Sequence, residues 1–377
     1  MRLMWLGTYE RDYPRGRVLI EGLREAGADV VERHRPVWER ERHKAGAFLR
    51  PLPLARTLGR FAGAWGALAV EGAREPGVDA IVAGYPAQPD ALPAWCVSRA
   101  RRVPLVVDMM ISLADTLGGD RGRAGRLTAS ALGGVDRATA HAADLVVADT
   151  AVGADWLAER FGVPRARLAV VPVGAEPARF PPVPPPDGAP TALFYGKLAP
   201  LHGVATVLAA ARRPGAPPVR LIGDGQLGGW LAAELARDRP AGLSWERWVP
   251  YEALGAEVGR AAICLGVFGE SEKAARVVPN KVWQAMAVGR PVVTADTPAV
   301  REVLEDCRTA LLVPAGDPGA LAEALARLAG DAALRARLGA AARAVYLERG
   351  TPAAVAGRLA DALGPLLPRE GPSWRVP

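Results

Sequence analysis

The sequence predicts an α/β protein with two tandem, doubly wound parallel sheets and a cleft between them. Short runs rich in Val, Ile and Leu alternate with helix-period segments along the chain, as expected for strands that are buried on both faces and connected by helices. A proline-rich break at residues 181–190 divides this series into two halves. With 377 residues, the chain is also longer than a typical single hydrophobic core.

The first half, residues 1–180, alternates candidate strands with candidate helices. The strands are expected at residues 2–6, 29–32, 80–83, 105–107, 145–148 and 168–171. Helices are expected between them, at residues 17–26, 89–100, 127–142 and 151–161. This alternation is the βαβ order of a parallel sheet.

A linker is expected at residues 181–190, which read PPVPPPDGAP. Six of these ten residues are proline, and proline fixes the backbone and donates no hydrogen bond to a helix or sheet. The segment therefore predicts a stiff connection between two domains, residues 1–180 and 191–350.

The second half repeats the βα pattern. Strands are expected at residues 193–195, 219–222, 243–248, 262–267, 291–294 and 310–313, and helices at 204–211, 227–238, 252–260, 281–287, 300–305, 319–328 and 332–348. Thr297-Pro298, Asp317-Pro318 and Thr351-Pro352 each place a capping residue before a proline in the first helical turn. A last helix, residues 352–367, is expected to pack back on the first half. Sheets of this kind bind ligands beyond the carboxyl ends of their strands, so two facing halves form an interdomain cleft.

Composition narrows the class of ligand. The net charge is +7 and the pI about 9.7, which favours anionic partners such as phosphorylated small molecules or an anionic membrane surface. No recognised nucleic-acid motif is present, so nucleic acid is not an expected partner.

The cysteines Cys96, Cys264 and Cys307 lie far apart, have no metal-ligand spacing and are typical of a reduced, cytoplasmic protein. The sequence shows neither a signal-peptide pattern nor an 18-residue apolar run, so no spanning helix is predicted.

The stretch RVVPNKVWQAMAVGRPVV, residues 276–293, reads as loop, helix, turn and strand. Asn280 is a favoured helix-capping type, Lys281 follows it, and Gln284 lies one turn further along the same side. Free backbone N–H groups, a lysine and an amide suit a phosphate attached to a sugar. The same residues equally fit an ordinary capped surface helix.

Two further loops leave strand ends in the second half. In FYGKLAPLHG, Gly196 and Lys197 end a strand, and His202 and Gly203 precede a helix. A cation and an imidazole near a helix N-terminus can hold a diphosphate, or they are a solvated lysine and a histidine that leads the helix. In LIGDGQ, residues 221–226, Gly223 allows either a close approach to a ligand or a tight βα turn, and the dinucleotide fingerprint is absent.

Taken in order, these segments resemble a known family. FYGKLAPLHG, LIGDG, ERWVPYEAL, PNKVWQAMAVGRPVVTADTPAVREVL and ALLVPAGDPGALAEALARL resemble the donor-binding domain of the GT-B glycosyltransferases, specifically retaining family 4, the glycosyl transferases group 1. ADLVVADTAVGADWLAERFGVPRARLAVVPVGAEPARF resembles the approach to the cleft in the same family. The resemblance covers nearly the whole chain. It implies two Rossmann-like domains, acceptor-side at residues 1–180 and nucleotide-sugar-binding at 191–350.

The resemblance also implies roles on the donor side. Lys197 matches the basic residue that contacts the donor diphosphate, and His202 stands where a lysine is common. Val249 would contact the base through its backbone, and Gln284 falls where a ribose-binding glutamate normally stands. The residues implied in donor binding are Gly196, Lys197, His202, Gly203, Gly223, Val249, Asn280, Lys281, Val282 and Gln284.

The sequence departs from the family pattern at its paired glutamates. Arg276 and Gln284 occupy those two positions, eight residues apart. Gln284 can still accept a hydrogen bond, but without a charge. Glu270 or Glu272 is a candidate replacement for the first acid. A histidine in place of lysine at position 202 makes phosphate binding pH-sensitive.

The acceptor is expected to bind in the first half. Residues 7–27 resemble the family's glycine-bearing first loop, which approaches the reaction centre and here contains Tyr9, Arg11, Arg15 and Gly16. Residues 108–121 follow a strand, and Asp108, Ser112 and Asp115 are candidates to hydrogen-bond acceptor hydroxyls. Asp115 equally fits a helix or turn cap. His141 lies in a helix and is expected to be structural.

Residues 38–61 are basic and rich in apolar side chains, with six Arg or Lys and two Glu. Such a segment can contact an anionic bilayer at the inner membrane face. The alternative is a helix over residues 54–68 that packs its apolar stripe on the core.

The resemblance implies a cytoplasmic glycosyltransferase that moves a sugar from a nucleoside diphosphate sugar to an acceptor hydroxyl, with retention, without a metal or other cofactor. Lys197, His202 and the helix from Asn280 would stabilise the leaving diphosphate. The acceptor is open among sugar, lipid-linked and natural-product hydroxyls of polysaccharide or glycoconjugate biosynthesis. Two alternatives share the fold: a sugar-nucleotide epimerase, and a non-catalytic subunit that binds a nucleotide sugar for a partner.

Overall fold

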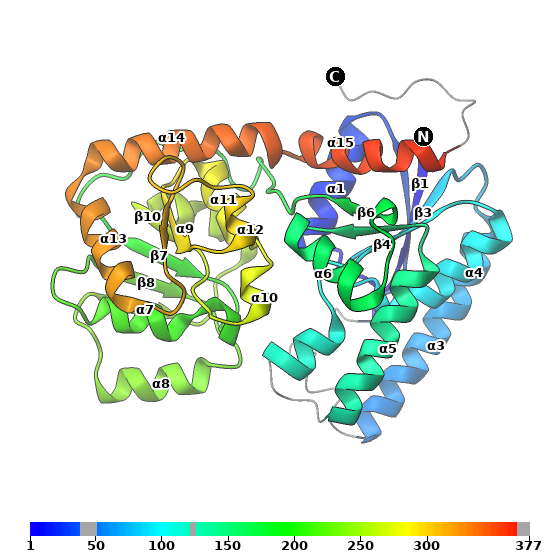
Figure 1. The fold of residues 1–377 in the computed structure, drawn as a ribbon, viewed down its shortest axis with the longest axis horizontal. Coiled ribbons are helices and arrows are strands. Elements are labelled where there is room, and N and C mark those ends of the chain that lie inside the picture. Colours follow the sequence, from blue (N-terminus) through cyan, green and yellow to red (C-terminus); the bar gives the residue numbers. More distant parts are fainter. Residues whose placement is uncertain (38–50, 121–125, 368–377) are drawn as a thin grey trace.

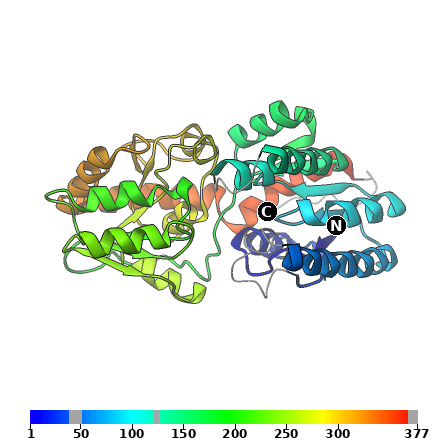
Figure 2. The same ribbon diagram turned by 90° about the horizontal axis from the view of Figure 1, so that it is seen from below.

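The computed structural model describes residues 1–37, 51–120 and 126–367. It contains two six-stranded parallel sheets, each in its own unit, and the two units lie side by side (Figures 1 and 2). The strand orders are β2-β1-β3-β4-β5-β6 and β12-β11-β10-β7-β8-β9. Helices cover both faces of each sheet, so the predicted fold of two doubly wound parallel sheets is confirmed.

The first unit is built around β1, whose side chains alternate between two cores. Leu3 and Trp5 face the core under α1, whereas Met4 and Leu6 face the core under α3 and α4. The strands are β1 Arg2–Gly7, β2 Asp29–His34, β3 Ala80–Ala83, β4 Leu105–Asp108, β5 Leu145–Ala148 and β6 Leu168–Val170. The helices are α1 Pro14–Glu25, α3 Pro51–Arg74, α4 Ala91–Arg101, α5 Arg126–Ala142 and α6 Ala151–Phe161.

The second unit has the same plan, with one apolar core on each face of its sheet. Its strands are β7 Ala192–Tyr195, β8 Val219–Ile222, β9 Leu243–Glu246, β10 Ile263–Leu265, β11 Val292–Ala295 and β12 Leu311–Val313. Its helices are α7 Val204–Ala211, α8 Gly228–Arg237, α9 Leu254–Arg260, α10 Glu272–Ala275, α11 Asn280–Val288, α12 Pro298–Arg301, α13 Pro318–Gly330 and α14 Ala332–Arg349.

The proline-marked helix starts are confirmed. The side chains of Thr297, Asp317 and Thr351 each accept a hydrogen bond from a first-turn N–H group. The prediction for Asn280 is wrong: Pro279 is the N-cap of α11, and Asn280 is already the first helical residue. Its side chain does not cap the helix, and its buried Oδ1 has no hydrogen-bond partner in the part of the chain that the structure describes.

Three elements of the second unit are shorter than predicted. Strand β9 ends at Glu246, so Arg247 and Trp248 belong to the following loop. Strand β10 covers 263–265 only, and α12 ends at Arg301. The two shorter strands lengthen the loops at the carboxyl edge of the sheet, where a ligand would bind.

Two segments tie the units together. Helix α15, Pro352–Leu363, leaves α14 and packs along α1, with Val355 and Leu359 in the core of the first unit (Figure 1). A Cβ on Gly22 would lie 1.9 Å from the carbonyl oxygen of Pro352, so only glycine allows this approach. In the proline-rich connection, Val183 and Pro184 accept hydrogen bonds from Arg290 of the second unit.

Helix α3 covers the described part of the predicted basic segment; residues 38–50 lie outside the described residues. Phe61 and Leu68 are buried, as core packing requires. No helix in the described ranges is long and apolar enough to span a membrane.

Candidate functional site

Lys281 defines the front of α11. Its side chain is 5% exposed, its Nζ has no hydrogen-bond partner among the described residues, and it lies 3.9 Å from the centre of the Phe194 ring. Burial lowers its pKa to about 7. A Cβ on Gly196 would lie 3.6 Å from this Nζ and 3.8 Å from Cε1 of His202. Lys281 is thus an unpaired amine held beside the loop after β7, where an anion would relieve its isolation.

His202 is a neutral group in this site. Its Nδ1 hydrogen-bonds with the carbonyl oxygen of Lys197. Burial, and secondarily the charge of Lys281, hold its pKa well below 6.5. Because a carbonyl only accepts, Nδ1 is the donor and Nε2 keeps a free lone pair. His202 is therefore uncharged at neutral pH in the unliganded protein, unlike the lysine that is common at this position.

The glycines of the site loops permit close packing of backbone on backbone. A Cβ on Gly223 would lie 2.0 Å from the carbonyl oxygen of Gly196, and one on Gly203 would lie 2.5 Å from the carbonyl carbon of Phe268. Tight loop packing accounts for these glycines without a ligand. Lys197 is exposed at the same edge.

Gln284 belongs to a buried polar network. Tyr195 donates to its Oε1 at 2.9 Å, and its Nε2 donates to the hydroxyl of Tyr251 at 3.2 Å. Tyr251 in turn donates to Glu176 at 2.8 Å, and Glu176 also pairs with Arg17 at 2.9 Å. Both ends of the amide are thus bonded to tyrosines. A neutral amide fits this place because a second carboxylate would be buried without a cation of its own.

The loop after β9 contains Val249, which is half-buried. Beside it, Trp248 has 72% of its side chain exposed. Arg247 pairs with Asp224 at 2.7 Å, which joins this loop to the one after β8.

Most acceptor-side candidates are occupied by internal partners. Arg15 lies in α1, is fully buried, and forms an ion pair with Asp108 at 2.5 Å. Tyr9 donates to Glu32 at 2.9 Å, and Arg11 pairs with the same carboxylate at 3.5 Å. Arg15 and Asp108 therefore join α1 to β4, and their contact with an acceptor stays a prediction. Gly16 lies in α1 with open space around it.

Ser112 also has internal hydrogen-bond partners. It is buried, donates to Asp136 at 2.7 Å, and accepts from the backbone N–H of Asp115 at 3.0 Å. His141, as predicted, bonds to backbone: its Nε2 lies 2.8 Å from the carbonyl oxygen of Phe161.

Asp115 reaches across the cleft. It pairs with Arg276 of the second unit at 2.8 Å, and the neighbouring Lys273 donates to Thr116 at 2.7 Å. Arg276 also lies 4.3 Å from the centre of the Trp156 ring. The residue at the position of the family's first acid therefore serves as a contact between the units.

Glu270 and Glu272, the candidate replacements for that acid, lie in different surroundings. The carboxyl of Glu270 lies where a Cβ on Gly316 would be, 2.5 Å from its Cδ, so it packs against the loop after β12. Glu272 is 92% exposed and lies 3.6 Å from Arg276.

Sequence reasoning missed three residues of the cleft. Tyr13 lies close to Asn280 of the second unit, and its ring lies 4.6 Å from that of Tyr85. Asp149 borders a pocket between the units. Tyr13, Tyr85 and Asp149 follow the carboxyl ends of strands β1, β3 and β5, respectively. Their position after a predicted strand could have marked them as cleft residues in the sequence.

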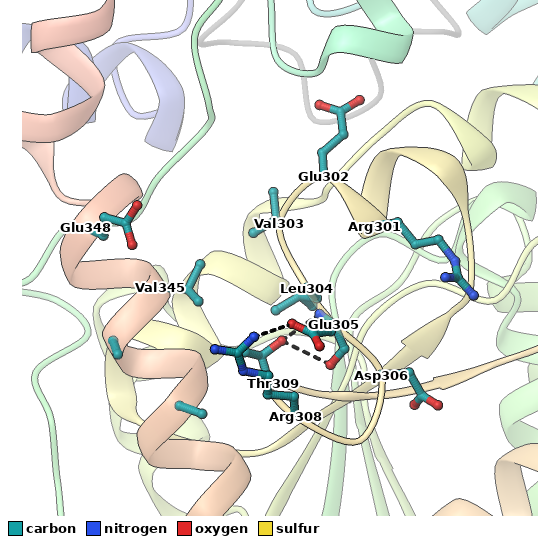
Figure 3. Close-up of a pocket in the computed structure, with 12 residues that line it drawn as sticks. Arg301, Glu302, Val303, Leu304, Glu305, Asp306, Arg308, Thr309, Val345 and Glu348 are labelled. Atoms are coloured by element: carbon teal, nitrogen blue, oxygen red, sulfur yellow. Dashed lines mark hydrogen bonds and ion pairs between the residues drawn. The ribbon is translucent and has the colours of Figure 1, made fainter.

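A larger groove, of about 540 Å³, lies between α14 and residues 301–309 (Figure 3). Glu302, Glu305, Asp306 and Glu348 give it an acidic lining, and Arg308 pairs with Glu305 at 2.8 Å. This lining does not suit an anionic donor.

The fold and the positions of these loops define the GT-B class. Residues 15–174 match the family profile described as glycosyl transferase 4-like domain, and residues 189–331 match the profile described as glycosyl transferases group 1. The chain belongs to the group 1 glycosyltransferase family.

Two curated relatives are similar over part of the chain. D-inositol 3-phosphate glycosyltransferase of Nocardia farcinica is 33% identical over 221 residues, which cover 52% of this chain and 47% of the relative. Phosphatidyl-myo-inositol mannosyltransferase of Mycobacterium leprae is 52% identical over 54 residues, 14% of each chain. The chain thus spans about half the length of the first relative and less of the second.

Solved structures share the fold over nearly the whole chain. Sucrose-phosphate synthase of Thermosynechococcus elongatus has a TM-score of 0.74 at 19% identity, covering 97% of this chain and 98% of its own. HepE of Anabaena, in complex with UDP-glucose, has a TM-score of 0.72 at 16% identity, covering 97% and 100%. At these identities the likeness shows the fold.

Proposed function

We propose that this protein transfers a sugar from a nucleoside diphosphate sugar to an acceptor hydroxyl, with retention of anomeric configuration and without a metal. The observation that carries the proposal is the buried, unpaired amine of Lys281 at the front of α11. Support comes from the group 1 family profile and from the UDP and UDP-glucose held by HepE. The acceptor and the sugar stay open.

In the proposed reaction the bond between the anomeric carbon and the diphosphate oxygen breaks. The acceptor oxygen bonds to the same face of that carbon, and its proton passes to the leaving diphosphate. Negative charge develops on the diphosphate, where Lys281, Lys197 and the first-turn N–H groups of α11 stabilise it. These groups supply the positive charge that a metal supplies in other transferases.

The donor site is tested by calorimetry with UDP, GDP, ADP and dTDP and their sugars. We expect one nucleotide to bind wild type and to lose at least tenfold in affinity in Lys281→Met and in Lys197→Met. Arg237→Met is the matched control, because it removes one exposed charge on α8 (72% exposed). If no nucleotide binds, or if Arg237→Met loses as much affinity, the donor site is wrongly placed.

One observation favours a second function. Arg276 and Gln284, at the positions of the family's glutamates, are both engaged by internal partners. A subunit that binds a nucleotide sugar without turning it over would have this pattern. Nucleotide binding with no release of nucleotide from its sugar, in the presence of acceptor panels, would favour that function over transfer.

A further inference from the structure

A narrow pocket of about 30 Å³ lies where the two units meet. Met110, Asp149 and Trp156 line it from the first unit, and Lys273 and Arg276 line it from the second. A space of this size holds one or two water-sized groups and not a sugar ring. It is therefore suited to receive a single hydroxyl of a larger molecule that lies in the cleft.

Among the described residues that line this pocket, Asp149 is the polar group without a partner side chain. It follows β5 directly and is 8% exposed. Within the described ranges, no side chain donates a hydrogen bond to its carboxyl. Burial raises its pKa to about 7, against the opposing effect of Arg15. A buried carboxyl without a partner is costly to keep, so its position calls for a ligand.

The charged neighbours of Asp149 are already paired. Arg15 pairs with Asp108, Arg276 pairs with Asp115, and Lys273 donates to Thr116. A cationic ligand would meet these three cations, and an anionic ligand would meet the Asp149 carboxyl itself. A neutral hydroxyl, which can donate or accept a hydrogen bond, avoids both conflicts.

We infer that Asp149 binds a hydroxyl of a neutral sugar or polyol acceptor, in a subsite that exists only when the two units are closed on each other. Lys273 and Arg276 form one wall of the pocket, so separation of the units removes that wall. Asp149 is thus a residue that positions the acceptor. The inference rests on the proposed transferase function and names the class of acceptor for it.

The test measures nucleotide release from the donor sugar with glycerol, myo-inositol or glucose as added acceptor. We expect at least one of these polyols to accelerate release by wild type. Asp149→Ala then raises the KM for that polyol at least tenfold, Asp149→Asn raises it less, and the Kd for the nucleotide stays within twofold in both. Asp155→Asn, an exposed aspartate of α6 at 59% exposure, is the control and leaves the KM unchanged.

A structural role for Asp149 is separated by thermal unfolding. Asp149→Asn should unfold at or above the wild-type temperature, because it removes a buried carboxyl that lacks a partner; a lower temperature would overturn the inference. So would an unchanged KM in Asp149→Ala, or no acceleration by any polyol while the nucleotide binds. If the nucleotide does not bind, the proposed function is overturned instead. Calorimetry with the same polyols alone then tests the subsite, and the absence of polyol binding would overturn the inference about Asp149.

Discussion

Lys281 is a residue whose pKa is strongly changed by folding. Its amine is buried under the loop after β7 with the Phe194 ring as its neighbour, and burial lowers its pKa from 10.5 to about 7. Folding therefore works against protonation at this position. A bound phosphate would raise the pKa of Lys281 again, because its negative charge stabilises the protonated amine.

Lys281 predicts how stability depends on pH in the unliganded protein. Between about pH 7 and 10.5 the unfolded lysine holds a proton that the folded one has lost, so the free energy of unfolding rises with pH. We expect wild type to gain up to about 1.4 kcal/mol per pH unit relative to Lys281→Met. Urea unfolding of both proteins at pH 7, 8 and 9 measures this difference. Parallel pH profiles would contradict it.

Gln284 gives a second prediction at the scale of one residue. Gln284→Glu places a carboxylate between Tyr195 and Tyr251, close to Glu176, in a buried site. We expect a loss of about 2 kcal/mol in the free energy of unfolding, measured in urea at pH 7.5. Gln226→Glu, at an exposed position, is the control and should change little. Equal effects of the two changes would argue against the network.

At the scale of elements, the sequence predicted what local chemistry determines. Strands 80–83, 145–148 and 219–222 were placed correctly, because runs of apolar residues bounded by turn residues mark a buried strand. Helix starts at Thr-Pro and Asp-Pro were also correct, since capping and proline both act within one turn.

The sequence did not predict which side chains meet. Arg15 and Asp108 are 93 positions apart, and each has a charge that suits a binding site as well as an ion pair. Gln284 matched a ribose ligand in type, but its partners come from β7 and from the loop after β9. Whether such a side chain has an internal partner depends on how the sheet and helices pack. Residue type and spacing along the sequence do not predict that packing.

The N-terminus of helix α6 is hydrogen-bonded by a side chain of the second unit. Glu302 accepts hydrogen bonds from the backbone N–H groups of Ala151 and Val152, both at 2.8 Å. Glu302→Ala leaves these first-turn donors without a partner and removes a negative charge from the positive end of the helix, so we expect a loss of about 1–2 kcal/mol in stability. Chemical unfolding measures it, with Glu305→Ala, whose pair with Arg308 is exposed, as the control.

At the scale of the whole molecule, several side chains hold the two units against each other. The pair of Arg276 and Asp115 is partly buried, with side chains 11% and 25% exposed. Thr150 adds a hydrogen bond to the carbonyl oxygen of Arg276 at 2.7 Å. Asp115 and Arg276 also line the pocket between the units, so the arrangement of the units and the shape of this pocket are linked.

A double-mutant cycle tests this link. Arg276→Met and Asp115→Asn should each increase the radius of gyration in small-angle scattering, and the double variant should be no larger than either single one. The expected coupling in unfolding is about 1 kcal/mol. The pair of Arg308 and Glu305, within one unit, is the control and should leave the radius unchanged. An unchanged radius in the cleft variants would show that the closed arrangement does not depend on this pair.

The path of α15 has a consequence for how the protein is made. The first unit completes its core with Val355, Ala356, Leu359 and Leu363, so its own first 170 residues leave an apolar face of α1 uncovered. A ribosome delivers those residues long before α15, and the second unit emerges in between. The second unit can therefore finish folding first, while the first waits for the end of the chain. Nascent chains stopped before residue 351 should bind chaperones at α1, and chains released after residue 363 should not.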